Sequence, residues 1–556
     1  MKRAAGSVVT VLAAMVLVGC AGNVIHRPQV AAVLCPLVSP PDDGQILEDP
    51  RVWDACRVSS IEIGPTTLSD QPYKLAVVEL DDQGRFRRDD QLEKLFKLLD
   101  EEMVNARAGR TGGVSLVVFV HGWRHNADVD DPNLKFARTV LYKTVFVENQ
   151  APQYTPNTKP RSVVGIYVGW RGKSLTLPGL DFIELASFWD RKFTAERVAT
   201  GSVRELFARL KYFREKSNKP PTVTNPICEN KASPTDAPIC PSVRLFIVGH
   251  SFGGLLVYNA LSESLIRSVT EADLGGGSDT VVGEYADLVM LVNPAVEGAR
   301  FEPLHQAVRR RQYNSRQLPI FVSVTATNDW ATGLAFPFGR WWNTIFESES
   351  PDNPADPEGA ERIGKEEREA NVNAMGHIKR YKTHVLCLAA GPDECPPKRR
   401  PTSNVKQLAA EWGSALEAIS DVVPRANCLA ALQETLASRY LRPAGVRWDE
   451  GDDDSGRRVR YREFFNTEPK RLRLRNDGLT LRVHESLEGR INGAPSLIHT
   501  PVWMVESNNK QIIDGHNDFT RQPFRDFLIQ LYHDRVMYGR NQEMLLNPET
   551  ECRPKR

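Results

Sequence analysis

The sequence lacks several features that mark whole classes of protein. Its 71 lysines and arginines balance 70 aspartates and glutamates, so the formal net charge over 556 residues is only +1. This balance gives no reason to expect nucleic acid as a partner. No Cys-x-x-Cys pair occurs, which argues against zinc, and no internal repeat is visible. Beyond residue 20, no apolar run approaches the roughly 20 residues of a membrane-spanning helix.

The first twenty residues have the pattern of an export signal. Two basic residues precede an apolar stretch from Val8 to Val18, which is too short to remain as a membrane span. The stretch leads into Leu-x-Gly-Cys, which resembles the lipobox of bacterial lipoproteins. We therefore expect residues 1–19 to be a signal peptide and Cys20 to be lipidated, so that it anchors the protein to a membrane of the cell envelope. Ala21, in place of an aspartate, favours the outer membrane if the host is Gram-negative. The alternative is an ordinary secreted protein cleaved nearby.

The other cysteines agree with an oxidising compartment. Their number is even, which is typical of disulfides in exported proteins. Short spacings suggest the pairs Cys35–Cys56, Cys228–Cys240 and Cys387–Cys395, and leave Cys428 and Cys552 as a fourth pair. The connectivity stays open at this point, because spacing alone does not determine it.

Short apolar runs rich in valine, isoleucine and leucine recur along the chain, and they are typical of buried parallel strands. The seven runs are Tyr73–Leu80, Val114–Val120, Ser162–Trp170, Val243–Gly249, Asp287–Asn293, Pro319–Ala326 and Pro501–Ser507. Helical patterns lie between several of them, for example at Asp90–Ala108 and Ala195–Lys216. Strands that alternate with helices predict an α/β fold with a doubly wound, mostly parallel sheet.

Longer segments interrupt the alternation and define the expected domains. Residues 20–70 form an N-terminal extension before the first predicted strand. The first part of the α/β core covers residues 71–330, and its last strand and helix cover residues 499–545, ahead of a C-terminal tail at 546–556. Residues 331–498 are too many for a structureless loop, so we expect a large inserted subdomain there.

One stretch combines a strand, a tight turn and a helix around a single serine. The run VRLFIVG enters Gly249-x-Ser251-x-Gly253, and the residues that follow, LLVYNALSESLI, have helical spacing. The glycines allow a tight turn and a close approach of the helix to the neighbouring strand. Ser251 would then lie at a helix N-terminus, where free N–H groups stabilise an adjacent anion. This context predicts a nucleophilic serine on a strand-to-helix turn.

With this motif the chain resembles the α/β-hydrolase superfamily, over most of its length except residues 20–70 and the insertion. After the run VSLVVFV comes His121-Gly122-Trp123, which is similar to the family's His-Gly motif on the loop that supplies one oxyanion N–H. The resemblance implies that the backbone N–H groups of Trp123 and Phe252 hold the oxyanion of a tetrahedral intermediate.

The resemblance also implies an acid after a strand downstream of the serine. Asp329 lies just past the run Pro319–Ala326 and is the expected acid, which would orient an imidazole and stabilise its charged form. Its rival is Glu297, because some family members carry the acid one strand earlier. The alternative for Asp329 is a loop aspartate that caps a helix.

The base comes last in the family's order. His516 lies in the loop between the last predicted strand and an amphipathic helix, which is the expected place for it. His499 precedes that strand and His533 lies on the helix, so neither follows a strand's carboxyl end. The order Ser251, Asp329, His516 matches the Ser–acid–His order of the superfamily.

These residues together predict a membrane-anchored serine hydrolase that cleaves carboxylic esters of a small molecule or a lipid through an acyl-enzyme. No cofactor and no metal is expected, because no acidic residue is spaced to complete a site with His121 and His125. The insertion falls between acid and base, whereas in many relatives the cap follows the strand before the acid. Thioesters and peptides therefore stay open as substrates. An acyltransferase and a non-catalytic envelope scaffold are the alternatives.

Overall fold

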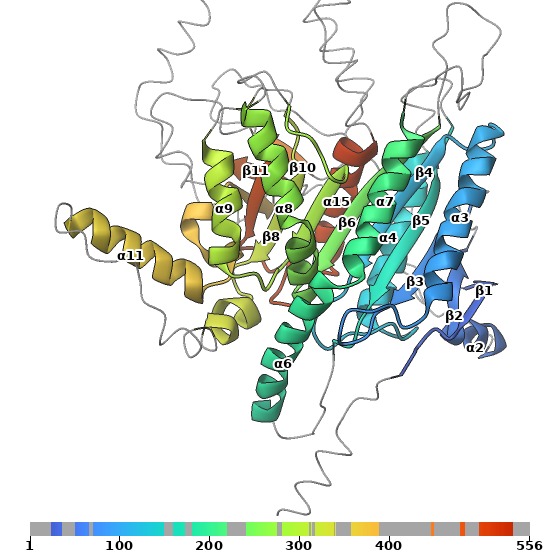
Figure 1. Cartoon of the computed structure of the whole chain (residues 1–556), viewed down its shortest axis with the longest axis horizontal. Helices are drawn as coiled ribbons and strands as arrows, with labels where there is room; N and C mark the ends of the chain where they lie inside the picture. Colours follow the sequence, from blue (N-terminus) through green and yellow to red (C-terminus); the bar gives the residue numbers. More distant parts are fainter. Residues whose placement is uncertain are drawn as a thin grey trace, which may run out of the picture.

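The structure, a computed structural model, describes a defined set of residues. They are 24–35, 50–65, 71–149, 159–172, 181–219, 241–274, 281–310, 313, 317–337, 340, 357–388, 446–449, 479–483 and 500–537. They form a twelve-stranded mixed sheet flanked by helices (Figure 1). Among the helices of these residues, none has the length and apolar character to cross a membrane.

The sheet is mostly parallel. From one edge to the other its strands are β1 (Gln29–Leu34), β2 (Ser59–Ile63), β3 (Lys74–Glu79), β5 (Ser162–Gly169), β4 (Gly113–Val120), β6 (Ser242–His250), β7 (Leu288–Val292), β8 (Phe321–Ala326), β12 (Val502–Ser507), β9 (His384–Leu388), β11 (Leu479–Val483) and β10 (Val446–Asp449). Neighbouring strands are parallel except at the pairs β2–β3 and β9–β11. All seven apolar runs lie in this sheet, so the predicted α/β architecture with a mostly parallel sheet is confirmed.

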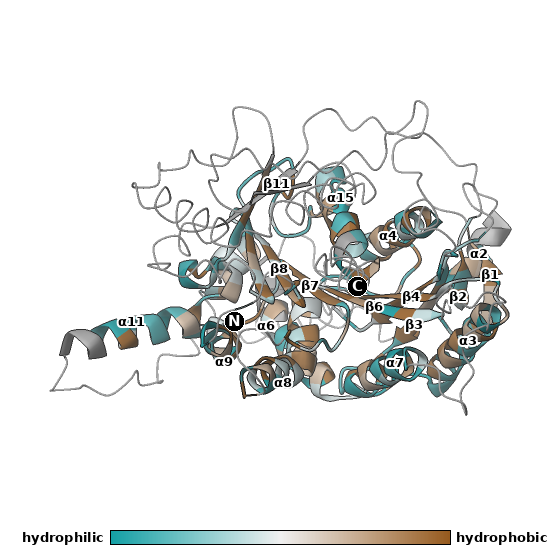
Figure 2. Cartoon of the chain, turned by 90° about the horizontal axis from the view of Figure 1, so that it is seen from above, coloured by the Kyte–Doolittle hydropathy of each residue, from teal (hydrophilic) through white to brown (hydrophobic). Residues whose placement is uncertain are grey.

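Helices cover both faces of the sheet (Figure 2). One face packs against α3 (Asp89–Arg107), α6 (Asp181–Thr200), α7 (Val203–Ser217), α8 (Phe252–Leu274) and α9 (Gly298–Arg309). The other face packs against α4 (Pro132–Asn149), α15 (Gln522–Leu531) and the π-helix η6 (Tyr532–Met537). Successive strand side chains point to opposite faces, so in β3 Ala76 and Val78 enter the first core while Leu75 and Val77 enter the second. Both faces are therefore buried, which explains why the strands read as continuous apolar runs.

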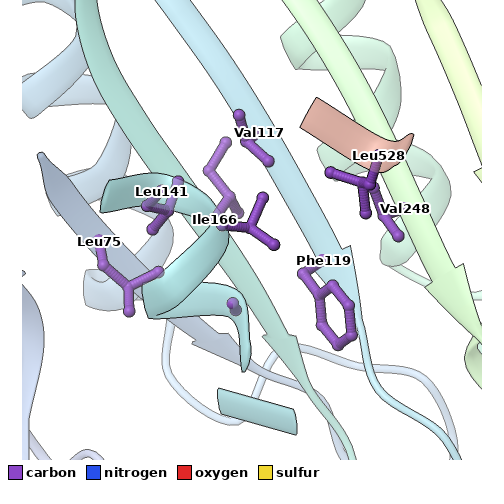
Figure 3. A pocket seen from close by; sticks show the side chains of 9 residues that line it. Leu75, Val117, Phe119, Leu141, Ile166, Val248 and Leu528 are labelled. Atoms are coloured by element: carbon purple, nitrogen blue, oxygen red, sulfur yellow. The ribbon is translucent and has the colours of Figure 1, made fainter. Parts of the chain in front are cut away.

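A small cavity within the second core contains no polar side chain (Figure 3). The side chains that Figure 3 labels around it are Leu75, Val117, Phe119, Leu141, Ile166, Val248 and Leu528. With no hydrogen-bonding group to orient a ligand, this cavity is a packing feature of the core.

The helical pattern at Ala195–Lys216 is divided between two helices. Gly201 and Ser202 separate α6 from α7, and the N–H of Ser202 donates to the carbonyl of Gly84. A Cβ at Gly201 would collide with the carbonyl of Gly84. The break between the helices therefore allows these two segments to approach closely. Periodicity alone did not reveal this contact.

Part of the predicted insertion, residues 331–498, belongs to the main sheet. Its described elements are the π-helix η2 (Ala331–Ala335), α11 (Pro357–Val372), the 3₁₀ turns η3 (Met375–His377) and η4 (Lys379–Tyr381), and strands β9, β10 and β11. Strand β9 pairs with β12 and so covers an edge that would otherwise expose unpaired backbone groups. Gly376 packs so closely against Thr325 of β8 that a Cβ would collide with that side chain. Residues 389–445, 450–478 and 484–499 lie outside the described part.

The N-terminal extension also joins the sheet, through β1 and β2. A disulfide links Cys35, at the end of β1, to Cys56 in α2 (Pro50–Val58), with 5.8 Å between the two Cα atoms. This predicted pair is confirmed. Cys387 is also disulfide-bonded, and its predicted partner Cys395 lies outside the described residues. Five further cysteines also lie outside the described residues: Cys20, Cys228, Cys240, Cys428 and Cys552.

Candidate active site

Ser251 lies in the turn between β6 and α8. Its backbone φ is +56°, in the left-handed region that residues with a side chain seldom adopt, at a cost of about 1 kcal/mol. The turn is held because the N–H of Ser251 donates to the carbonyl of Val292 in β7 over 3.0 Å. The predicted strand–turn–helix segment is present, and strained residues of this kind cluster at functional sites.

Glycines let the segments around Ser251 approach one another. A Cβ at Gly253 would collide with the carbonyl of Val120, the last residue of β4. A Cβ at Gly122, in the loop after β4, would lie 2.7 Å from the Cβ of Ser251. The His-Gly loop and the serine turn are therefore in direct contact, and larger residues at these positions would separate them.

The three side chains predicted as a catalytic triad form one hydrogen-bonded chain. His516 Nε2 lies 2.7 Å from Ser251 Oγ, and His516 Nδ1 lies 2.8 Å from Asp329 Oδ2. Because an ionised carboxylate only accepts, Nδ1 carries a proton, and Nε2 of the neutral ring accepts from the serine hydroxyl. Ser251 and Asp329 are at most 1% exposed and His516 is 5% exposed. This arrangement can pass a proton from the serine to the imidazole.

Asp329 is held as a carboxylate by several donors. Burial alone would raise its pKa, but the electrostatic interaction and hydrogen bond with His516, with further bonds from Thr332, lower the pKa to about 2. Its other oxygen, Oδ1, accepts the backbone N–H groups of Ala331 over 2.9 Å and Thr332 over 3.2 Å. These two donors fix the orientation of the carboxylate toward His516.

The rival candidates lie elsewhere in the described fold or outside it. Glu297 immediately precedes α9 and forms an ion pair with Lys192 of α6, with 2.6 Å between Oε1 and Nζ. His533 lies in η6, directly after α15. His499 lies outside the described residues.

The two N–H groups predicted to bind an oxyanion flank Ser251. Trp123 follows Gly122 in the loop after β4, and Phe252 is the first residue of α8. Neither backbone N–H donates a hydrogen bond to another described residue. Phe188 of α6 packs against both side chains, with ring centroids 5.2 Å from Trp123 and 4.7 Å from Phe252. Phe188 thus links the loop after β4 to the start of α8.

His121 supports the same loop in its neutral form. Burial lowers its pKa to about 4. The N–H of Trp170 donates to His121 Nε2 over 3.0 Å, so the ring proton is on Nδ1, which lies 3.0 Å from the carbonyl of Gly122. His125 contacts Asp131 instead. The described residues contain no cluster of three or more side chains suited to hold a metal.

Asn293 is a site residue that the sequence analysis missed. It follows β7 with a φ of +44°. Its Nδ2 donates to the backbone carbonyls of His516 over 2.9 Å and Gly515 over 3.1 Å, while its Oδ1 accepts the N–H of Ala326 over 2.9 Å. Asn293 therefore ties the loop of His516 to the end of β8. The signal in the sequence is an asparagine directly after a buried strand.

His377 was also missed, and it reaches Asp329 through Thr332. The Thr332 hydroxyl donates to Asp329 Oδ2, and His377 Nε2 lies 2.8 Å from that hydroxyl oxygen. Since the hydroxyl's proton goes to the carboxylate, His377 donates through Nε2. His377 belongs to η3, within the predicted insertion. No sequence spacing links it to Asp329, so only the folded chain reveals it.

The site lies at the carboxyl-terminal ends of the neighbouring parallel strands β4, β6, β7, β8 and β12. This is the usual place for ligands in open α/β sheets. No protein-family model, curated protein or solved structure matches this chain. Its chemistry is therefore inferred from its own geometry.

Proposed function

We propose that the protein is a serine hydrolase of the α/β-hydrolase superfamily that cleaves carboxylic esters of a small molecule or lipid. The observation that carries the proposal is the hydrogen-bonded series Ser251–His516–Asp329, with 2.7 Å and 2.8 Å between the bonded atoms. A nucleophile, a base in hydrogen-bond reach and a third group that orients the base are the parts that covalent acyl transfer requires.

The proposed reaction has two halves. Ser251 Oγ attacks the carbonyl carbon while His516 Nε2 takes the hydroxyl proton, and the oxyanion is held by the N–H groups of Trp123 and Phe252. His516 then gives the proton to the leaving alkoxide, so that an acyl-serine and an alcohol remain. Water attacks the acyl-serine by the same path in reverse, with Asp329 keeping the imidazole oriented throughout. Because Ser251 is fully buried, the side chains around it must move apart before a substrate enters.

The same machinery supports two alternatives. An acyltransferase would use an alcohol in place of water in the second half, and a peptidase would protonate an amine in the first. A third alternative is a non-catalytic envelope scaffold with this fold. The intact hydrogen-bonded chain favours an enzyme, because a scaffold has no need of a strained serine bonded to an oriented histidine.

We also propose that the protein acts at the cell envelope, attached to a membrane through a lipid on Cys20. This proposal is supported by the basic, apolar and Leu-x-Gly-Cys pattern of the first twenty residues. The Cys35–Cys56 disulfide agrees with an oxidising compartment. A lipid anchor would bring the site close to membrane lipids as substrates.

The test uses the protein beginning at Ala21, with Ser251→Ala and a control, Ser262→Ala, in α8 away from the turn. p-Nitrophenyl esters from acetate to palmitate and a fluorophosphonate probe are applied to each. We expect wild type and S262A to react and S251A to be inert. Folded wild type that neither hydrolyses any ester nor reacts with the probe would refute the proposal and favour the scaffold. Probe labelling without ester hydrolysis would favour the peptidase or the transferase.

A further inference from the structure

Behind Ser251, a buried histidine contacts the main chain of the proposed base. His250, the last residue of β6, is fully buried, and its Nε2 lies 3.0 Å from the backbone carbonyl oxygen of His516. A carbonyl oxygen only accepts, so His250 Nε2 carries a proton and donates it. The same oxygen accepts from Asn293, so both of its lone pairs are used. Two side chains from neighbouring strands thus hold the main chain of His516.

The other nitrogen of His250 leads to a second chain of contacts. Asn133 lies in α4, with its Oδ1 3.3 Å from His250 Nδ1 and its Nδ2 3.1 Å from His125 Nε2. His125 Nδ1 in turn lies 3.0 Å from Asp131 Oδ1. None of these four side chains belongs to a residue more than 8% exposed. The chain therefore runs, shielded from water, from the loop after β4 to the loop of His516.

The ends of this chain determine where its protons lie. Burial would raise the pKa of Asp131, but the hydrogen bond and charge of His125 and the other donors outweigh it and lower the pKa, so Asp131 is an acceptor. His125 Nδ1 therefore donates to Asp131. At the other end, burial and the nearby rings of His516 and His125 lower the pKa of His250 well below its usual value. His250 is then neutral, with its single ring proton on Nε2.

With Nδ1 of His250 unprotonated, the 3.3 Å approach of Asn133 Oδ1 to that nitrogen is a contact and not a hydrogen bond. Asn133 Nδ2 donates to His125 Nε2, and His125 Nδ1 donates to Asp131. The bond from His250 Nε2 to the carbonyl of His516 therefore fixes the position of the ring proton.

We propose that His250 is a positioning residue for the base: its Nε2–H holds the main chain of His516, while Asn133, bonded through His125 to Asp131, lies against its other nitrogen. The inference rests on the proposed function of Ser251 and deepens it. The chain also connects the loop that carries the oxyanion N–H of Trp123 to the loop that carries the base. A shift in one loop is therefore resisted by the other.

Two amide substitutions separate the two contacts of His250. In His250→Gln the amide nitrogen reaches the position of Nε2, so the bond to His516 is kept. In His250→Asn the amide reaches only the position of Nδ1, so the contact with Asn133 is kept and the bond to His516 is lost. Both variants lose the ring contact with Phe519, whose centroid is 4.2 Å away, so that loss is common to the two.

The rates of ester hydrolysis are divided by the concentration of active sites, which is measured by titration with the fluorophosphonate. We expect H250N to lower kcat about 100-fold, with KM within about threefold of wild type, because a misplacement of about 1 Å in a reacting group costs rate of this order. H250Q should stay within about tenfold of wild type. Equal kcat values for the two variants, or a wild-type kcat in H250N, would overturn the proposal.

A second measurement does not depend on activity. In ¹⁵N-histidine-labelled wild type, nitrogen shifts should show His250 protonated at Nε2, with its signals assigned by their loss in H250Q. An unprotonated Nε2 of His250 would overturn the positioning role even in an active enzyme. A wild type that is inert to substrate and probe would instead refute the function proposed for Ser251.

Discussion

Replacing Asp329 with asparagine is expected to keep the shape of the site and remove most of its activity. In wild type, Oδ1 accepts the N–H groups of Ala331 and Thr332, and Oδ2 lies 2.8 Å from His516 Nδ1. An asparagine must keep its oxygen toward the two backbone donors, because its NH₂ group would repel them. The NH₂ group is therefore turned toward His516, where the carboxylate oxygen was.

The proton on the imidazole then changes place. Nδ1 accepts from the new NH₂ group, so the proton of the neutral ring is on Nε2 and points at Ser251, which can no longer give up its own proton. The equivalent change in a serine protease triad costs about 10⁴-fold in kcat. We expect a loss of about 10³- to 10⁴-fold here, which is about 4–5.5 kcal/mol of transition-state stabilisation.

The assay compares kcat on the best p-nitrophenyl ester, the rate of fluorophosphonate labelling and the melting temperature. The control is Asp518→Asn, which makes the same chemical change two residues from His516, on a side chain that is 41% exposed and paired with Arg521. D518N should behave as wild type. A folded Asp329→Asn protein with kcat within about tenfold of wild type would refute the assignment of Asp329 as the orienting acid.

Three further predictions concern the turn, acid stability and the disulfide. Gly122→Ala should lower kcat about 100-fold while the protein stays folded, because the new Cβ would lie 2.7 Å from that of Ser251 and push the oxyanion loop away. Unchanged kinetics would contradict the close contact. Asp329 has a pKa of about 2 when folded against 3.8 as its reference, so its contribution of about 2 kcal/mol is complete above about pH 4 and is lost as the pH falls toward 2. In urea unfolding, the advantage of wild type over D329N should shrink by that amount across this range, and a constant difference would speak against it. Replacing Cys35 and Cys56 by serine should cost about 3 kcal/mol of unfolding free energy, measured by calorimetry of wild type and the double variant without reductant, and equal stability would contradict this contribution.

Much of the fold is predictable because its strands are buried on both faces. A strand such as β4 has no solvent side, so it appears in the sequence as a continuous apolar run without reference to its neighbours. The insertion behaves differently. Strand β9 lies far from β12 in the chain, and its place in the sheet depends on the open edge that β12 offers.

The candidate site likewise has one part that the sequence reveals and another that it does not. The turn at Ser251 is encoded locally, because its glycines and the flanking strand and helix all lie within a few residues. Asn293 and His377 carry no such pattern, and their roles come from hydrogen bonds that cross 223 and 45 positions of the chain. The contact of His250 with Asn133 crosses 117 positions.

The alternation of strands and helices, the serine turn, and the order in which serine, aspartate and histidine follow the strand ends are all visible in the amino-acid sequence. Periodicity, apolar burial and the steric freedom of glycine act over a few residues, so they can be read from the chain directly. Folding is needed to bring Ser251 and His516, 265 positions apart, to within 2.7 Å of each other, and to place His250 and Asn293 against the carbonyl of that histidine. Hydrogen bonds are sensitive to distance changes of a few tenths of an ångström. The required distances arise only when the strands lie side by side in the sheet.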